Sequence, residues 1–351
     1  MERTNRRRDV KSLTLDELGR VVAELGQPSF RVNQLVEWLY GKHVSSFDEM
    51  SNLPSAFRTA LAERYDLSLP VERARQTSRD GSRKYLLEFA DGVSVETVAM
   101  PNKNKLAVCI STQAGCNMGC VFCATGDSGL VRSLTAGEMY DQVMHVADDF
   151  GMRPTSVVFM GQGEPFANYD ATLAALRWLN SPKGAGIGAR HLTVSTSGVI
   201  PRIRSFAHEP EQFTLAISLH SAVQETRNKL MPGVKKYTLP RLYEAMQYYT
   251  EKTGRRPTYE FALISGINDT RPEMDALVDF CQGTLAHVNI IQLNPTPLSL
   301  LKPSSEEKAA ELVRRLAEHG VEATIRNSRG NDIDAACGQL MQRMRAESSS
   351  K

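Results

Sequence analysis

The sequence predicts an α/β fold with a parallel sheet, preceded by a small helical module. From position 105 onward, short apolar runs typical of strands alternate with helical patterns, which is the order of repeated βαβ units. Before position 70, apolar residues recur instead at the three- and four-residue spacing of helices. At 351 residues, the chain has room for about two domains.

The first 70 residues are predicted to form the helical module, an accessory domain. Thr14 and Glu17 have the spacing of a capping box, which places the start of the first helix. We expect a second helix over 31–39 and a third over 56–65, where apolar positions keep the helical spacing.

Residues 71–104 are expected to form a β-hairpin that links the module to the core. Two stretches, 84–89 and 93–98, have the composition of strands. Each is preceded by an Asp-Gly turn signal, at Asp80-Gly81 and Asp91-Gly92.

Residues 105–340 are predicted to form the core, and 341–351 a disordered tail. Eight βα units would close a TIM barrel, whereas six indicate an incomplete barrel or an open doubly wound sheet. In either fold, polar groups that follow the strands face the active site. The expected strands are 106–111, 156–160, 191–195, 213–219, 258–263 and 288–293, with 322–326 as a possible seventh, and the expected helices are 136–150, 169–178, 239–250, 271–281 and 305–318.

Composition excludes several classes of protein. Hydrophobic residues at 41% and charged residues at 23% are ordinary globular values, and a net charge of +2 neither favours nor excludes nucleic acid. No apolar run reaches the ~18 to 20 residues of a membrane span, and no signal-peptide core follows the N-terminal arginines. Six cysteines are too few for a secreted disulfide scaffold. We therefore expect a cytoplasmic protein without membrane contact.

Three cysteines stand close together directly after the first predicted core strand, as Cys116-x3-Cys120-x2-Cys123. Thiolates at this density suit zinc or an iron-sulfur cluster. A structural zinc site normally has a fourth ligand; no further cysteine follows before Cys281, although His145 is available. Three thiolates can instead hold three irons of a 4Fe-4S cluster and leave the fourth iron open. On spacing alone, structural zinc and plain buried cysteines remain alternatives.

Polar residues and glycines follow the later strands. In Gly161-Gln162-Gly163-Glu164-Pro165, two glycines permit close backbone approach to a ligand, and Glu164 can accept a hydrogen bond from an ammonium group. An ordinary strand-to-helix turn would also explain this segment. Several later strand ends could hydrogen-bond ribose or carboxylate oxygens, or serve as turn and cap residues: Ser195, Ser218-Leu219-His220 and Asn294.

The cysteine segment, residues 115–123, resembles the defining motif of the radical S-adenosylmethionine (SAM) superfamily. The resemblance implies a partial (β/α)6 TIM-like barrel and a 4Fe-4S cluster whose open iron is chelated by the cofactor S-adenosyl-L-methionine. It also implies reductive cleavage of that cofactor to a 5'-deoxyadenosyl radical. The cluster ligands would be Cys116, Cys120 and Cys123, and the cofactor-binding residues Gly163, Glu164, Ser195, Ser218, Leu219, His220 and Asn294.

Nearly the whole chain is similar to the RlmN/Cfr family of RNA adenine methyltransferases. The similarity includes the helical module, which the resemblance implicates in RNA binding. The segments that carry it are 30–34, 45–54, 108–111, 115–123, 160–165, 215–220 and 333–340.

This resemblance implies a catalytic role for three further residues. Cys337 would take a methyl group from one cofactor molecule, and the radical from a second would remove a hydrogen atom from that methyl group, so two cofactor molecules are used per turnover. The carbon radical would add to adenine, joining RNA and protein. Glu96 would then remove the proton of the ring carbon, and Cys109 would attack the Cys337 sulfur to form a transient disulfide. Without the resemblance, Cys109, Cys281 and Cys337 would all be interpreted as buried thiols, and Glu96 as a solvated strand residue.

The two branches of the family differ in the carbon that they methylate: carbon 2 for RlmN, on 23S rRNA and tRNA, or carbon 8 for Cfr, which confers antibiotic resistance. Pro165 resembles the RlmN form, whereas 123–127, Ser221 and 229–232 resemble Cfr. Gln162 departs from the methionine that is usual in both. We favour carbon 2.

The resemblance implies 23S rRNA, tRNA and an electron donor such as flavodoxin as partners, and we expect the protein to be a monomer.

Two other classes of protein stay open: a non-catalytic RNA-binding protein with a structural metal, and a radical enzyme acting on a peptide or small molecule. The second would typically carry further cysteine clusters. Basic residues that could contact phosphates, or simply form a solvated face, are Arg6, Arg7, Arg8, Arg73, Arg75, Arg79, Arg83, Lys84, Lys103 and Lys105.

Overall fold

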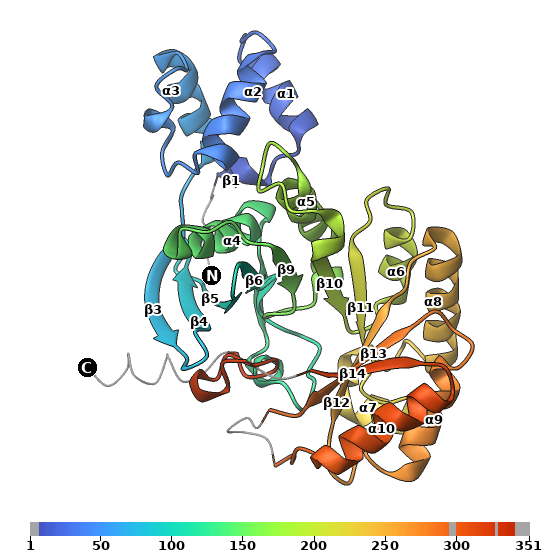
Figure 1. Cartoon of the computed structure of the whole chain (residues 1–351). Coiled ribbons are helices and arrows are strands. Elements are labelled where there is room, and N and C mark those ends of the chain that lie inside the picture. Colours follow the sequence, from blue (N-terminus) through green and yellow to red (C-terminus); the bar gives the residue numbers. More distant parts are fainter. Residues whose placement is uncertain (1–6, 295–299, 327–328, 341–351) are drawn as a thin grey trace.

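A ten-stranded sheet forms the centre of the molecule (Figure 1). The computed structural model describes residues 7–294, 300–326 and 329–340, so the predicted tail 341–351 lies outside the described residues. The strands follow the order β14-β13-β12-β11-β10-β9-β6-β5-β4-β3. Among the described residues, no helix is long and apolar enough to cross a membrane.

The seven strands from β6 to β14 in this sheet are parallel and lie in sequence order. Because right-handed crossovers that never reverse direction place their helices on one face, the sheet has no switch point and is not doubly wound. β14 does not pair with β6, so the barrel is incomplete, as predicted. The strands are β6 (Lys105–Cys109), β9 (Ser156–Phe159), β10 (Leu192–Thr196), β11 (Thr214–Ser218), β12 (Thr258–Leu263), β13 (His287–Gln292) and β14 (Glu322–Arg326).

The helices of the core follow these strands. All five predicted core helices are present, whereas α6 and α7 were missed, because seven residues each are too few to show a helical period. The core helices are α4 (Ala136–Phe150), α5 (Tyr169–Asn180), α6 (Ile200–Phe206), α7 (Gln224–Leu230), α8 (Leu239–Thr253), α9 (Arg271–Cys281) and α10 (Glu306–Glu318).

Three antiparallel strands extend the sheet beyond β6: β3 (Val71–Thr77), β4 (Arg83–Glu88) and β5 (Ser94–Asn102). The predicted hairpin is β4 and β5. β3 was missed because it is an edge strand without an apolar face, its residues alternating between exposed and half-buried. Since β5 pairs with β6, this segment is continuous with the core sheet.

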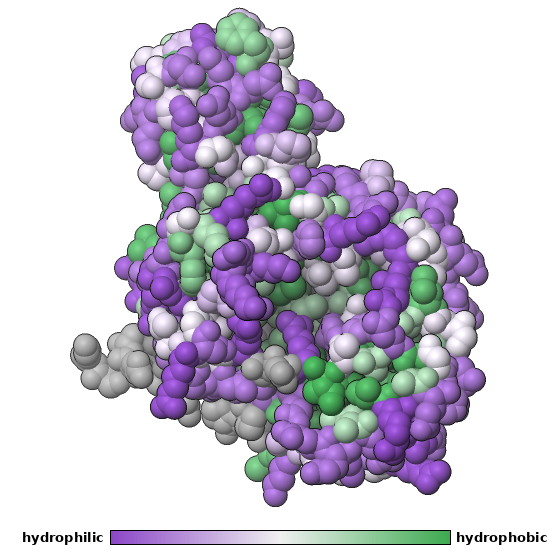
Figure 2. Space-filling model, in the orientation of Figure 1, coloured by the Kyte–Doolittle hydropathy of each residue, from purple (hydrophilic) through white to green (hydrophobic). Residues whose placement is uncertain are grey.

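The helical module contains α1 (Leu15–Glu24), α2 (Arg31–Val36), which continues as a π-helical turn over Glu37–Gly41, and α3 (Ser55–Arg64). The predicted capping box at the start of α1 is present. A short parallel pair, β1 (Arg8–Asp9) and β2 (Tyr65–Asp66), closes the module. Figure 2 shows it as a lobe on top of the core.

Candidate active site

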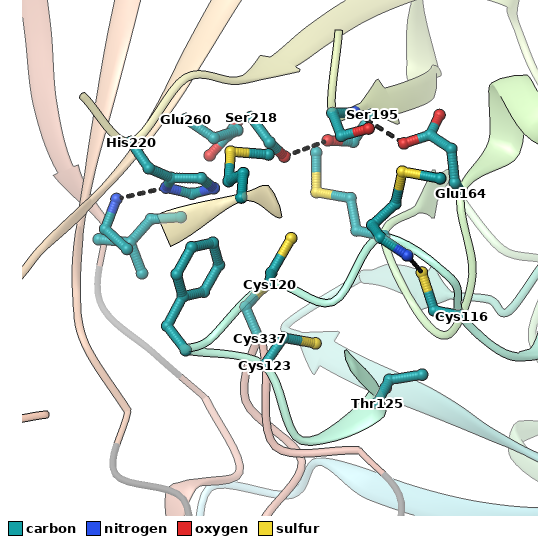
Figure 3. A pocket seen from close by; sticks show the side chains of 18 of the residues that line it. Cys116, Cys120, Cys123, Thr125, Glu164, Ser195, Ser218, His220, Glu260 and Cys337 are labelled. Carbon is teal, nitrogen blue, oxygen red and sulfur yellow. Dashed lines mark hydrogen bonds between the residues drawn. The ribbon is translucent and has the colours of Figure 1, made fainter. Parts of the chain in front are cut away.

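A cavity that is open to solvent lies at the carboxyl ends of the parallel strands; its empty space, with the solvent at its mouth included, is about 980 Å³. Strand ends form one side of it, and the cysteine loop together with a C-terminal segment forms the other (Figure 3). Ten of the predicted site residues line it: Cys116, Cys120, Cys123, Gly163, Glu164, Ser195, Ser218, His220, Asn294 and Cys337.

The cysteine loop is closed by a small hairpin, β7 (Gln113–Gly115) with β8 (Leu130–Ser133). Gly115 has a φ of +75°, and a Cβ there would lie 1.9 Å from the carbonyl oxygen of Gly129. The Cys116 backbone N–H donates to that same carbonyl over 3.0 Å. Glycine therefore lets the two ends of the loop meet, which confines the three thiols to one side of the cavity.

The three thiols influence one another electrostatically. Burial raises the pKa of Cys116 to about 11. Burial also raises the pKa of Cys120, and the neighbouring Cys123 and Cys116 raise it further. Such thiols ionise when a metal supplies positive charge, and soft thiolates suit iron-sulfur clusters.

Within the described residues, no three His, Cys, Asp or Glu side chains converge on a site for a single metal ion. Cysteines that bind separate irons of one cluster need not converge in this way, so the donor set fits a 4Fe-4S cluster. His145 is not the fourth ligand that we considered. Its Nε2 lies 2.8 Å from Glu72 Oε2, on β3.

Glu164 is held from two sides at the end of β9. Oε1 accepts the Phe166 N–H at 2.9 Å, and Oε2 accepts the Ser197 N–H at 2.7 Å. Burial raises the pKa of this carboxyl, while the two backbone N–H groups act to lower it. A carboxylate fixed in this way at a cavity wall can accept from a cationic ligand group.

Two hydroxyl groups and one side-chain amide line the cavity at the ends of later strands: Ser195, Ser218 and Asn294. Ser195 Oγ lies 3.5 Å from Ser218 Oγ, across β10 and β11. Asn294 Nδ2 donates to the Cys337 carbonyl at 3.2 Å, so it also fixes the C-terminal segment. Leu219 does not line the cavity, because its side chain is buried in the core.

His220 has a left-handed backbone, with a φ of +57°, which is strained for a residue with a side chain. Its Nδ1 accepts the Ala262 N–H at 2.9 Å, so the neutral ring carries its proton on Nε2. Burial, assisted by Arg227, lowers the His220 pKa to about 3. The ring packs on Phe122 of the cysteine loop, with the centroids 4.5 Å apart. His220 therefore presents a neutral, oriented imidazole beside the cluster loop.

Cys337 and Cys109 come together from distant parts of the sequence. Both line a second hollow adjoining the main cavity, and Cys337 lines both spaces. Burial, assisted by the neighbouring Cys337 thiol, raises the pKa of Cys109 to about 12. Cys337 is exposed and lines both spaces; burial of its thiol in the surrounding protein raises its pKa, while Arg326 lowers it. Both thiols are free in this structure.

Glu96 lies outside the main cavity, on β5, and is 2% exposed. Its Oε1 forms an ion pair with Lys84 Nζ over 3.4 Å. Lys84 is itself 2% exposed, so the expectation that it contacts RNA phosphates is wrong. Arg6 lies outside the described residues.

Sequence reasoning missed Glu260, which lines the cavity, and Arg227, which contacts the cavity-lining residue Ser197. Glu260, on β12, lines the cavity; Asn289 Nδ2 donates to its Oε1, while Oε2 has no hydrogen-bond partner among the described residues. Buried Arg227 donates to the Ser197 carbonyl over 2.6 Å, and burial lowers its pKa to about 10. The available signal for Glu260 was a carboxylate inside an otherwise apolar strand, Thr258–Leu263.

Comparisons with known proteins agree with this geometry. Residues 110–281 match the radical SAM superfamily, and residues 9–67 match the ribosomal RNA large subunit methyltransferase N-terminal domain. The chain is 47% identical to a probable dual-specificity RNA methyltransferase RlmN of Geobacillus thermodenitrificans, over 96% of this chain and 94% of that protein. For the protein of the same name from Bacillus subtilis, the identity is 43%, over 97% and 95%.

A crystal structure of a radical SAM methyltransferase from Sphaerobacter thermophilus has a TM-score of 0.89 and 42% identity, covering 95% of this chain and 99% of that one. An incomplete barrel with a three-cysteine loop at its mouth is thus the fold and site of a radical SAM enzyme, a class that uses S-adenosylmethionine and a 4Fe-4S cluster. Within that class, the chain belongs to the RlmN family of RNA methyltransferases.

Proposed function

We propose that this enzyme methylates carbon 2 of an adenosine in 23S rRNA, and of an adenosine in tRNA, through a methyl group carried on Cys337. The observation that carries the proposal is the position of Cys337, which lines both the cavity of the three-cysteine loop and the adjoining hollow that Cys109 lines. An adenine ring carbon is a poor target for a cationic methyl donor. A protein thiol that carries the methyl group to a radical step overcomes this difficulty.

Cys116, Cys120 and Cys123 would hold the cluster. The residues that would hold S-adenosylmethionine are Gly163, Glu164, Ser195, Ser218, His220 and Asn294. Leu219 is left out, because it does not line the cavity and its backbone N–H and carbonyl are both hydrogen-bonded within the fold. When bound, these groups supply a carbon radical able to remove hydrogen from an unactivated methyl group.

The protein's own residues perform the remaining steps. The Cys337 thiolate attacks the methyl carbon of a first cofactor molecule, and S-adenosylhomocysteine leaves. The methyl carbon, after losing a hydrogen atom, adds as a radical to carbon 2 of adenine, and the resulting adduct gives one electron back to the one-electron carrier that serves as reductant. Glu96 takes the proton of the substituted ring carbon. Cys109 then attacks the Cys337 sulfur; the carbon-sulfur bond breaks, its electron pair stays with carbon, which takes up a proton to become the methyl group, and a disulfide forms. Two cofactor molecules are therefore consumed per turnover.

Reductant and RNA must both reach the site from outside. A one-electron donor of the flavodoxin class would supply the reducing electron, and the helical module would bind RNA beside the core. The free thiols and the reducible disulfide fit the cytoplasm, where thiols are kept reduced. We propose that the enzyme acts as a monomer.

An in vitro methylation assay tests this function. Protein reconstituted without oxygen is incubated with S-adenosylmethionine, reductant and unmodified 23S rRNA or tRNA, and nucleosides are identified by mass spectrometry. We expect 2-methyladenosine in both RNAs. Formation of 8-methyladenosine would assign the enzyme to the Cfr branch, and the absence of any methylated adenosine would refute the proposed activity.

A further inference from the structure

Lys84 occupies an unusual position for a lysine. Its side chain is 2% exposed, and its Nζ reaches two groups from different parts of the chain. One is Glu96 Oε1 at 3.4 Å, and the other is the carbonyl oxygen of Asp334 at 3.1 Å. Desolvating an ammonium group costs several kcal/mol unless its partners compensate. A fold that only needed a stable strand would place an apolar residue here.

Strand register explains how the two charges meet. In the antiparallel pair β4–β5, Lys84 lies opposite Val98 and Leu86 lies opposite Glu96, so Lys84 and Glu96 are diagonal neighbours on one face. Val98 in turn lies opposite Cys109 in the β5–β6 pair. One face of the sheet therefore carries Lys84, Glu96 and Cys109.

The segment that carries Cys337, residues 329–340, covers this face. Ala335 and Leu340 pack there in one apolar cluster with Val98 and Cys109. Polar contacts fasten the segment to the β3–β4 turn: Asp332 Oδ1 accepts from Ser78 Oγ at 2.6 Å, and Asp80 Oδ2 accepts the Gly330 N–H at 3.0 Å. The Lys84 contact to the Asp334 carbonyl is the buried member of this set.

We propose that Lys84 is a positioning residue for the general base Glu96, an inference that rests on the proposed function. Its ammonium group pairs with the Glu96 carboxylate and fixes it relative to the segment that carries Cys337. In the step concerned, the bond between carbon 2 and its hydrogen breaks, the proton passes to a Glu96 oxygen, and the electron pair stays in the purine ring. Loss of Lys84 therefore slows the release of RNA from the protein rather than its attachment.

The test measures covalent RNA–protein adduct and released methylated RNA during a single turnover, on denaturing gels. In Lys84→Met, we expect adduct to accumulate and release to slow by about tenfold to hundredfold. This is less than the ~10²- to 10⁴-fold loss expected for removing a general base itself, because Glu96 is still present. Lys84→Arg, which keeps the charge, should recover part of the rate. Asp332→Ala removes an exposed anchor of the same segment without touching Glu96, and its ratio of adduct to product should match the wild type.

A second comparison separates positioning from folding. Once Glu96→Gln has removed the base, adding Lys84→Met should slow release no further, and the double variant leaves no buried unpaired charge that would impair folding. Additive effects in this cycle would overturn the proposal, as would wild-type release in Lys84→Met.

A Cys109→Ala variant distinguishes failure of the proposed function from failure of the role proposed for Lys84. It cannot form the disulfide, so it should retain the adduct. If it yields no adduct, the covalent route in the proposed function is wrong, and the role of Lys84 is wrong with it. If it traps adduct while Lys84→Met releases RNA normally, only the role of Lys84 is refuted.

Discussion

At the scale of single residues, Gln162 has a buried side-chain amide without a hydrogen-bond partner among the described residues. Its side chain is 1% exposed, and neither Oε1 nor Nε2 has a hydrogen-bond partner among the described residues. It does not line the main cavity. An unsatisfied buried amide destabilises a fold by about 1–3 kcal/mol. Methionine, the residue that the family resemblance leads us to expect here, has a similar volume and no such need.

We therefore predict that Gln162→Met raises the free energy of unfolding by about 1–2 kcal/mol. Denaturant unfolding monitored by circular dichroism measures the change. Gln282→Met, at an exposed glutamine, is the matched control and should shift stability by less than about 0.5 kcal/mol. Destabilisation by Gln162→Met would mean that the amide has a partner which the fold itself does not supply.

The residues of the site differ in how far sequence predicts them. The three cysteines can be found from spacing, because a metal site needs several ligands within one loop. Glu164 can be suggested by its place between glycine and proline at a strand end, where an ordinary turn remains an alternative. Cys109, Cys337 and Glu96 have no such local signature, since only the folded chain brings them together; their roles come from family resemblance. Lys84 was misjudged as a phosphate contact because sequence alone does not show that residues 329–340 cover it.

At the scale of elements, the turn after β9 depends on Gly163. Its φ is +97°, and a Cβ would lie 2.5 Å from Gln113 Cβ, in the strand that leads into the cysteine loop. The side-chain oxygen of Gln113 accepts the Glu164 N–H at 2.9 Å. Glycine therefore lets the Glu164 turn pack directly on the cysteine loop.

Gly163→Ala should lower the free energy of unfolding by about 3 kcal/mol, from backbone strain and overpacking together. Gly254→Ala is the control, since its φ of +65° is also strained but a Cβ there meets nothing within 4 Å. That control should cost only about 1 kcal/mol. Chemical denaturation compares the two, and equal losses would show that the contact with Gln113 is unimportant.

Elements with a clear local pattern were the predictable ones. β12, β14, α4 and α9 begin and end at the predicted residues. β12 is an almost entirely buried run, while helical periodicity marks α9 and, together with a capping box at Thr135, α4. The edge strand β3 and the short α6 and α7 lack that periodicity, so tertiary contacts define them. The order of the strands in the sheet distinguishes an incomplete barrel from a doubly wound sheet. No short segment of the sequence predicts this order.

At the scale of the whole molecule, a buried ion pair joins the helical module to the core. Lys11 Nζ contacts Asp141 Oδ2 on α4, and His43 Nε2 lies 2.9 Å from Asp141 Oδ1. The side chains of Lys11 and Asp141 are 0% and 3% exposed. Removing one partner leaves the other charge buried and unpaired, which destabilises a protein by about 3–5 kcal/mol.

Asp141→Asn should therefore lower stability by about 3 kcal/mol, and the double variant Lys11→Met/Asp141→Asn should recover much of that loss. Thermal unfolding measures both. Glu225→Gln, which breaks the exposed pair with Lys229, should leave the unfolding midpoint unchanged. A double variant no more stable than Asp141→Asn would show that the ion pair is not what joins the module to the core.

The central claim is that Cys337 carries the methyl group to RNA, and isotopic labelling tests it most directly. Protein with a fully deuterated methyl group on Cys337 is incubated with unmodified RNA, reductant and unlabelled S-adenosylmethionine for a single turnover. Mass spectrometry then measures how many deuterium atoms the methyl group of the product nucleoside contains. The account predicts a methyl group with two deuterium atoms and one hydrogen, because one deuterium is removed in the radical step. A methyl group without deuterium, or with all three, would contradict it.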